Sequence, residues 1–306
     1  MSPALADSVL HSASTLGYQI NLVGRALRTQ RTGTIGLLIP DLTNPYFSQL
    51  AESLNKHVSE GGSELLVASS RGSTRVEQRL VESLIGQQID GLIVIPCDEN
   101  ESASHISEAS SRVPTIQIDR KADRKTTYYI GTDSHVGFQL IAEHITSVNT
   151  SRQAPVIYIG ADLHIPSAKD RLEAFTKHFP DSLTFLGDYS LGWGYDACTR
   201  ILNAGISEGI IVASADIIAF GAINSLTKAS LRIPDDFRII GYDGAYSDLS
   251  LHPSLTTVIQ PVDSIAQHAW RALEDQSASE IVSRDVRIPP RLSIGTSSPE
   301  SLNSLK

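Results

Sequence analysis

From Thr34 onward, short and almost uninterrupted apolar runs alternate with longer stretches in which apolar residues recur every three or four positions. The short runs predict strands buried on both faces, and the periodic stretches predict amphipathic helices. The predicted strands are 35–39, 65–68, 91–95, 115–118, 156–159, 210–213 and 238–242. The predicted helices are 47–60, 75–87, 136–146, 168–179, 195–203, 217–229 and 262–276. This alternation predicts an α/β fold whose doubly wound parallel sheets are covered by helices on both faces.

The alternation is interrupted at three places, which we interpret as crossovers between two lobes. A strand ends in Gly131, Thr132 and Asp133 just before a helix, and the other two breaks lie at 257–261 and near 283–287. A chain of 306 residues is also long for one hydrophobic core. The predicted lobes are 33–131 plus 262–283 for the first and 132–260 plus 284–298 for the second, followed by a tail at 299–306.

The segment before these lobes has a different pattern. Residues 2–17 predict one helix, with Ser2 as its cap, Pro3 at its first position and Gly17 just past its end. Its apolar stripe has no partner upstream, which indicates that it belongs to a larger helical unit. Residues 21–32 predict a short basic helix or linker.

Charge is unevenly distributed along the chain. The net charge is −9, but residues 1–35 carry +2, which leaves −11 for the remainder. An acidic body disfavours nucleic acid wrapped around it, so contact with nucleic acid is expected only at the basic start. A solvated helix face explains the three arginines Arg25, Arg28 and Arg31 equally well.

Composition and motifs indicate in which compartment the protein is located and which kinds of chemistry it carries out. Cys97 and Cys198 are far apart and form no ligand spacing, which favours a reducing, cytoplasmic location. The sequence has neither an apolar run of membrane-spanning length nor a secretory signal. It also lacks the GxGxxG, P-loop, GxSxG and HExxH motifs, and its nine histidines show no metal-ligand spacing. We therefore expect no enzyme, no cofactor and no metal.

Acidic residues follow several predicted strands. Asp41, Asp119 with Arg120, Asp216 and Asp243 each stand where a buried run ends. Ligands in open α/β sheets bind beyond the carboxyl ends of the strands, so these residues are site candidates. Each one alone is also explained as a turn or helix cap.

Nine motifs occur in the order of one known family. They are VLHSASTLGYQIN, NLVGRALRT, TIGLLIPDLTNPYF, IDGLIVI, VPTIQIDR, SAKDRLEAF, GDYSLGWGY, RIPDDFRIIGYDG and LTTVIQP. In these motifs, from Ser2 to about Ser298, the chain resembles the lactose-repressor (LacI/GalR) family of bacterial transcription regulators. The body also resembles periplasmic sugar-binding proteins, so the resemblance implies a two-lobed periplasmic-binding-protein-like fold.

The resemblance implies a homodimer, or a tetramer, that binds operator DNA and takes a small-molecule effector in its cleft. NLVGRALRT resembles the family's hinge helix, which enters the minor groove. Leu27 then matches the wedge that unstacks a base step, with Asn21, Arg25 and Arg28 beside the DNA. Leu27 packed on the body is the alternative. Residues 1–20 resemble only the end of the DNA-binding head, without its first two helices, so we expect this chain to bind operator poorly.

The family's effector pocket maps onto eleven residues of this sequence. They are Asp41, Tyr46, Phe47, Asp119, Arg120, Ser167, Arg171, Tyr189, Asp216, Asp243 and Gln260. The family's Asn-Asp pair is Ala215-Asp216 here, which removes one polar contact. The predicted function is a ligand-responsive repressor for a sugar or sugar derivative, with a nucleobase as the other option. The alternative is an effector-binding module that has no role on DNA.

Overall fold

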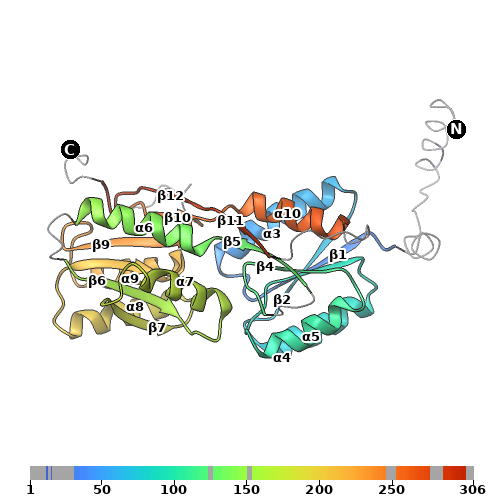
Figure 1. Cartoon of the computed structure of the whole chain (residues 1–306), viewed down its shortest axis with the longest axis horizontal. Coiled ribbons are helices and arrows are strands. Elements are labelled where there is room, and N and C mark those ends of the chain that lie inside the picture. The colour runs from blue at the N-terminus through green and yellow to red at the C-terminus, as the bar shows by residue number, and fades with distance from the viewer. Residues whose placement is uncertain are drawn as a thin grey trace.

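The computed structural model describes residues 12, 15, 31–122, 127–149, 154–245, 253–275 and 285–300. Two lobes lie side by side, each built on a six-stranded sheet (Figure 1). The expected hinge residues Asn21, Arg25, Leu27 and Arg28 lie outside the described residues, as do most of residues 1–20 and the end of the expected tail.

The first lobe contains a parallel sheet in the order β11-β5-β4-β3-β1-β2. Its elements are β1 (Thr34–Ile39), α3 (Pro45–Glu60), β2 (Glu64–Ser69), α4 (Thr74–Gly86), β3 (Gly91–Val94), α5 (Glu101–Ser110), β4 (Thr115–Ile118), β5 (Tyr128–Thr132), α10 (Val262–Asp275) and β11 (Asp285–Ile288).

The second lobe contains a sheet in the order β12-β10-β9-β8-β6-β7, in which only the β10–β12 pair is antiparallel. Its elements are α6 (Ser134–Val148), β6 (Val156–Ala161), α7 (Pro166–Thr176), β7 (Leu183–Gly187), α8 (Leu191–Asn203), β8 (Gly209–Ala213), α9 (Asp216–Lys228), β9 (Phe237–Asp243), β10 (Thr256–Ile259) and β12 (Arg291–Ser293).

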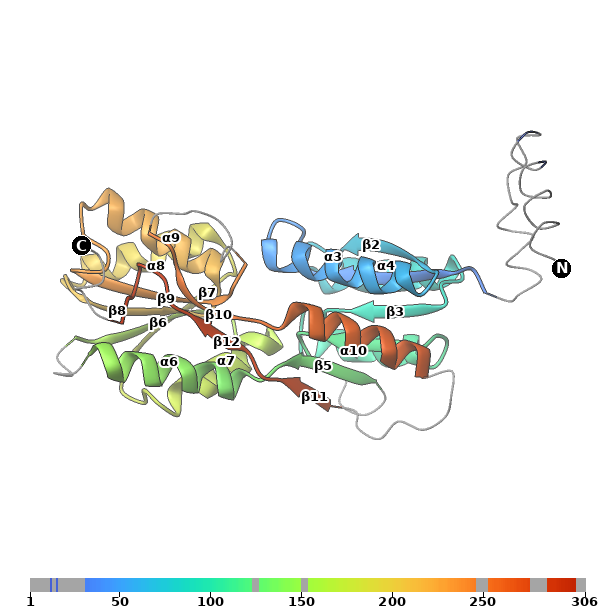
Figure 2. The ribbon, with the colours of Figure 1, turned by 90° about the horizontal axis from the view of Figure 1, so that it is seen from above.

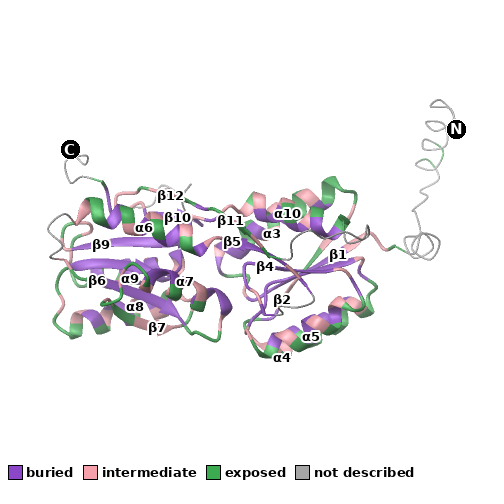
Figure 3. Cartoon of the chain, in the orientation of Figure 1, coloured by how far each residue is buried: buried purple, intermediate pink, exposed green. Residues whose placement is uncertain are grey.

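Helices cover both faces of each sheet, which explains why the central strands are continuous apolar runs. In the first lobe α3 and α10 pack on one face, and α4 and α5 pack on the other. In the second lobe α6 and α7 pack together on one face, and α8 and α9 on the other (Figure 2). The strands are largely buried, whereas the outward helix faces are exposed (Figure 3).

The chain crosses between the lobes three times. The first crossing follows β5 at Asp133 and the second follows β10 at Gln260 and Pro261, as predicted. The third differs from the prediction, because β11 pairs with β5 in the first sheet and residues 285–288 therefore belong to the first lobe. This crossing lies at Pro289 and Pro290, where the two missing N–H groups interrupt the hydrogen-bonded ladder.

The pattern also missed α5, β7 and β12. In α5 the apolar stripe is short because serine and alanine occupy several inward positions, and Ser102 and Ala109 are buried there beside Ile106. The strand β7 lies at the sheet edge, and its Leu183 is 47% exposed, so no continuous apolar run marks it. Within the described residues, no helix is both long and apolar enough to cross a membrane.

Candidate functional site

A small cavity lies between the lobes, at the carboxyl ends of the central strands. Its volume is about 10 Å³. Its lining residues come from both lobes and are Asn44, Tyr46, Phe47, Asp119, Arg120, Ser167, Arg171, Tyr189 and Asp243. Eight of the eleven candidates predicted from the sequence therefore meet here, and Asn44 joins them.

The start of α3 delivers three of these residues. Asn44 caps the helix by accepting a hydrogen bond from the Tyr46 N–H at 3.0 Å, and Pro45 occupies the first helical position. Tyr46 and Phe47 then lie in the first turn, with their ring centroids 5.3 Å apart. The Asn-Pro pair is a recognisable helix-start signal, and it could have identified Asn44 from the sequence.

Asp119 follows β4 in a left-handed backbone conformation, with φ of 61°. Such conformations are costly for residues other than glycine and cluster at binding sites. The Tyr46 hydroxyl donates to Oδ1 of Asp119 at 3.1 Å. Burial, Asp119 and Asp243 together raise the pKa of Tyr46 well above its ordinary value, so Tyr46 is a neutral hydrogen-bond donor.

Arg120 is buried between two aromatic rings. Its guanidinium carbon lies 5.5 Å from the ring centre of Phe47 and 5.7 Å from that of Tyr189. One N–H donates to the Pro96 carbonyl at 3.4 Å, and Nε lies 3.7 Å from Asp119. Among the described residues, the buried Nε of Arg120 and hydroxyl of Tyr189 have no hydrogen-bond partner. Both groups are therefore available to a ligand.

Arg171 links the two lobes from the second turn of α7. Its Nη1 lies 3.2 Å from Oδ1 of Asp243 and donates to the Ser214 carbonyl at 2.5 Å, and its Nη2 lies 3.9 Å from Asp119. Its guanidinium also stacks on the Tyr242 ring at 4.2 Å. Burial opposes its charge, but Tyr189 and Asp243 outweigh burial and raise the pKa of Arg171 well above its ordinary value.

Asp243 is the second cavity carboxylate with a positive φ, 119°. Gln260 donates to its Oδ1 at 2.8 Å. Burial raises the pKa of Asp243 to about 6, against the lowering effect of Arg171. Its charge therefore depends on pH near neutrality.

Three predicted candidates lie outside the cavity lining. Asp41 closes a turn, since its carboxylate accepts from the N–H and hydroxyl of Thr43 at 2.8 Å each. Asp216 is buried under the site, where it accepts from the Thr257 hydroxyl at 2.6 Å and the Ala245 N–H at 2.9 Å. Burial, then Asp243, raises the pKa of Asp216 well above its ordinary value. The contacts of Asp41 with Thr43 are those of a turn cap, which is the alternative explanation for a carboxylate at the end of a strand.

Gln260 lies on the second crossover and supports the site from behind. Its Oε1 accepts from the Thr132 hydroxyl at 2.5 Å, and its Nε2 holds Asp243. It therefore connects the first and second crossovers to a cavity carboxylate.

This arrangement suits a small polyhydroxylated ligand. Carboxylates and guanidinium groups form charge-assisted hydrogen bonds with hydroxyls, and the rings of Phe47 and Tyr189 offer apolar faces. Within the described ranges, no group of three or more His, Cys, Asp or Glu residues is arranged to hold a metal ion.

Comparison with known proteins places this geometry in a family. A model of the periplasmic binding protein domain matches residues 35–251. The ribose operon repressor of Escherichia coli K12 is 26% identical over 88% of this chain and 83% of its own length. The catabolite control protein A of Priestia megaterium is 26% identical over 95% of this chain and 90% of its own length.

The fold comparison agrees. The lac repressor dimer bound to operator and the anti-inducer ONPF superposes with a TM-score of 0.84, at 22% identity, over 96% of this chain and 89% of that chain. This chain belongs to the periplasmic-binding-protein domain family and, within it, to the lactose-repressor (LacI/GalR) family of transcription regulators.

Proposed function

We propose that the interlobe cavity binds a small sugar, and that this binding changes the operator affinity of a homodimeric repressor located in the cytoplasm. The observation that carries the proposal is Arg171, which contacts Asp243 of its own lobe and Asp119 of the other. A ligand that replaces these contacts acts on both lobes at once. The two buried free thiols, Cys97 and Cys198, agree with a reducing compartment.

The size of the cavity supports a mechanism in which the lobes move. Ligand pockets usually measure about 300–1,000 Å³, whereas this one has a volume of about 10 Å³ and its lining is almost wholly buried. The lobes must therefore separate to admit a sugar and close again around it. The ligand shifts this equilibrium only by the difference in its affinity for the two states. A coupling of about 1–3 kcal/mol would change operator affinity about 5- to 150-fold.

D-ribose is the first ligand to test, because the ribose operon repressor is among the most similar relatives. Calorimetric titration of the chain with D-ribose, D-glucose, cellobiose and hypoxanthine separates a monosaccharide site from a disaccharide or nucleobase site. We expect a monosaccharide to bind. Hypoxanthine binding without any sugar binding would refute the sugar assignment.

A matched pair of variants tests whether the cavity is the site. Arg120→Gln removes a cavity guanidinium, and Arg112→Gln makes the same charge change at an exposed position of the same lobe. Losing hydrogen bonds from a charged donor costs about 1.5–3 kcal/mol, so Arg120→Gln should lower sugar affinity about 10- to 150-fold. Arg112→Gln should leave the affinity unchanged, and equal losses in both variants would place the site elsewhere.

A further inference from the structure

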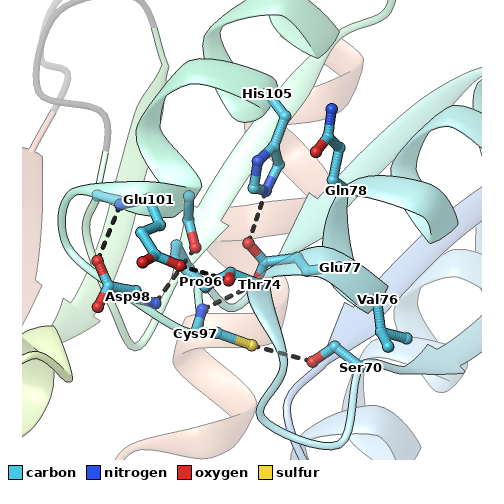
Figure 4. Close-up of polar contacts among 12 residues, drawn as sticks. Ser70, Thr74, Val76, Glu77, Gln78, Pro96, Cys97, Asp98, Glu101 and His105 are labelled. Carbon is cyan, nitrogen blue, oxygen red and sulfur yellow. Dashed lines mark hydrogen bonds and ion pairs between the residues drawn. The ribbon is translucent and has the colours of Figure 1, made fainter.

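A second polar cluster lies in the first lobe, beside the loop that joins β3 to α5 (Figure 4). Its centre is Glu77 of α4, whose side chain is fully buried. One carboxylate oxygen, Oε2, accepts the Cys97 N–H at 2.7 Å, and the other, Oε1, lies 2.7 Å from Nε2 of His105 on α5. Both oxygens of the carboxylate are therefore occupied.

The peptide that Glu77 holds also contacts the cavity. Cys97 is preceded by Pro96, whose carbonyl accepts the hydrogen bond from Arg120. Two residues further along the same loop, the Glu99 N–H donates to the His164 carbonyl of the other lobe at 3.0 Å. The Glu99 carboxylate also accepts from Lys169 of α7 at 2.8 Å. One loop thus connects Glu77 with a cavity arginine and with the opposite lobe.

Desolvating a buried carboxylate costs free energy. A well-packed apolar residue in its place commonly gives a protein of equal stability. General stability therefore does not explain Glu77. Its specific contribution is geometric, because a rigid acceptor fixes the backbone N–H of Cys97 and, through the planar peptide bond, the carbonyl of Pro96.

We infer that Glu77, held by His105, is a positioning residue that fixes the Pro96–Cys97 peptide and thereby sets the guanidinium of Arg120 in the cavity. The inference rests on the proposed function only for the contact between Arg120 and a sugar in the cavity. Its geometric part concerns the free protein and is testable without any ligand.

Cys97 is a convenient reporter of this loop. Its thiol lies 3.0 Å from the Ser70 hydroxyl and is buried, and burial, with Glu77, raises its pKa to about 12. The chain has two cysteines, and the other, Cys198, is buried in the second lobe. With Cys198→Ala as background, the rate at which Ellman's reagent modifies Cys97 in the native full chain measures how often this loop opens.

Three variants of α4 test whether Glu77 fixes the Pro96–Cys97 peptide. Glu77→Leu removes both acceptor oxygens at similar volume, and Glu77→Gln keeps one oxygen for the Cys97 N–H. Glu82→Leu is the matched control on the exposed face of the same helix. We expect Glu77→Leu to accelerate Cys97 modification about 10- to 100-fold, Glu77→Gln to recover most of the protection, and Glu82→Leu to change nothing. If Glu77→Leu does not fold, His105→Leu, which leaves the carboxylate without its imidazole partner, is the replacement. Unchanged rates would overturn the inference.

A double-mutant cycle with Arg120→Gln then separates positioning from general loosening. If Glu77 acts on Arg120, the fold-changes of Glu77→Leu and Arg120→Gln in Cys97 modification are coupled, and in the double variant they do not multiply. If the two fold-changes multiply independently, the inference is wrong.

The same four proteins are titrated with D-ribose. We expect Glu77→Leu to weaken ribose binding in the wild-type background and to add nothing in the Arg120→Gln background. Coupled modification rates in a protein that binds none of the tested sugars would refute the proposed function but support the positioning role. Sugar binding together with independent rates of Cys97 modification would support the proposed function but refute the positioning role.

Discussion

The two halves of the cavity differ in how fully their charged groups are paired. In the second lobe, Arg171 is held by Asp243 and the Ser214 carbonyl, and Asp243 is held in turn by Gln260. In the first lobe, Arg120 has one long hydrogen bond, at 3.4 Å, and a buried Nε that lies 3.7 Å from Asp119 and has no hydrogen-bond partner among the described residues. Each half contributes one arginine and one aspartate with a positive φ, yet only one half is closely connected.

This difference in pairing indicates which half of the cavity stabilises the fold and which half binds the ligand. Charges that are already paired cost little to keep buried, but they gain little from a ligand. Groups that are desolvated and only partly paired gain most when a ligand supplies the missing acceptor. We therefore expect the second-lobe half to support the fold and the first-lobe half to recognise the ligand.

Removing each arginine in turn gives the largest effect and tests this division directly. Arg171→Met leaves Asp243 buried without its cation, while Asp119 keeps Arg120 at 3.7 Å, and we expect a loss of about 3–5 kcal/mol in the free energy of unfolding. Arg120→Met loses one long hydrogen bond, two ring contacts and a 3.7 Å contact with Asp119, which keeps Arg171 at 3.9 Å, and we expect a smaller loss of about 1–2 kcal/mol. Urea denaturation measures both. Lys169→Met, on the exposed side of α7, is the control and should cost about 1 kcal/mol or less. Equal losses for the two arginines would contradict the comparison.

The pH dependence of stability gives the next largest effect. The pKa of Asp243 is about 6 in the folded protein against 3.8 for the free side chain, so between these pH values the folded state binds more protons than the unfolded state. Its stabilising contribution is full below pH 3.8 and is lost as the pH rises through about 6. The free energy of unfolding of the wild type, minus that of Asp243→Asn, should fall by about 1–3 kcal/mol between pH 4 and pH 7.

Two comparisons test the origin of this effect, which includes the change that Asp243→Asn causes in the titration of Asp216, whose pKa Asp243 raises. Burial lowers the pKa of His144, which gives a pH dependence of the opposite sign, but His144 is present in both proteins and cancels in the difference. At the exposed Asp236, a hydrogen bond from Arg232 lowers the pKa. The free energy of unfolding of the wild type, minus that of Asp236→Asn, should therefore change weakly and in the opposite direction, falling as the pH drops below 4. A flat difference for Asp243→Asn would mean that its carboxylate stays ionised in the folded protein.

Sequence pattern predicted the parts of this fold that depend on continuous burial. The central strands and the helices that cover them were found because apolar runs and stripes record the faces they bury. The pattern could not find β7, because an edge strand leaves Leu183 exposed, and it assigned 285–288 to the wrong lobe. Which sheet a strand joins depends on its pairing partner, and a single strand's residues do not record that partner.

The site shows the same limit. Strand-end carboxylates were visible in the sequence, but whether each one faces the cavity depends on backbone conformation. Asp119 and Asp243 adopt positive φ and line the cavity, whereas Asp41 turns back on Thr43 and Asp216 is held beneath the site by Thr257. Glu77 gave no signal, because a buried glutamate in an amphipathic helix has the same local pattern as an exposed one.

The smallest expected effect concerns the helix starts that deliver cavity residues. α3 begins with Asn44 and Pro45 and has a side-chain cap, whereas α7 begins with Ile165 and Pro166 and has none. Asn44→Ala should cost about 1 kcal/mol of stability, as losses of N-caps do. It should also weaken sugar binding, because Tyr46 and Phe47 follow in the first turn. Asn100→Ala is the matched control, since Asn100 occupies the same position in α5 but forms no capping hydrogen bond, so its loss should be close to zero. Urea denaturation and calorimetry of the two variants measure the contrast. Equal stability losses would show that the cap of α3 adds nothing to the first-lobe half of the cavity, while a stability loss without any change in sugar affinity would show that the first turn of α3 holds its rings in place without Asn44.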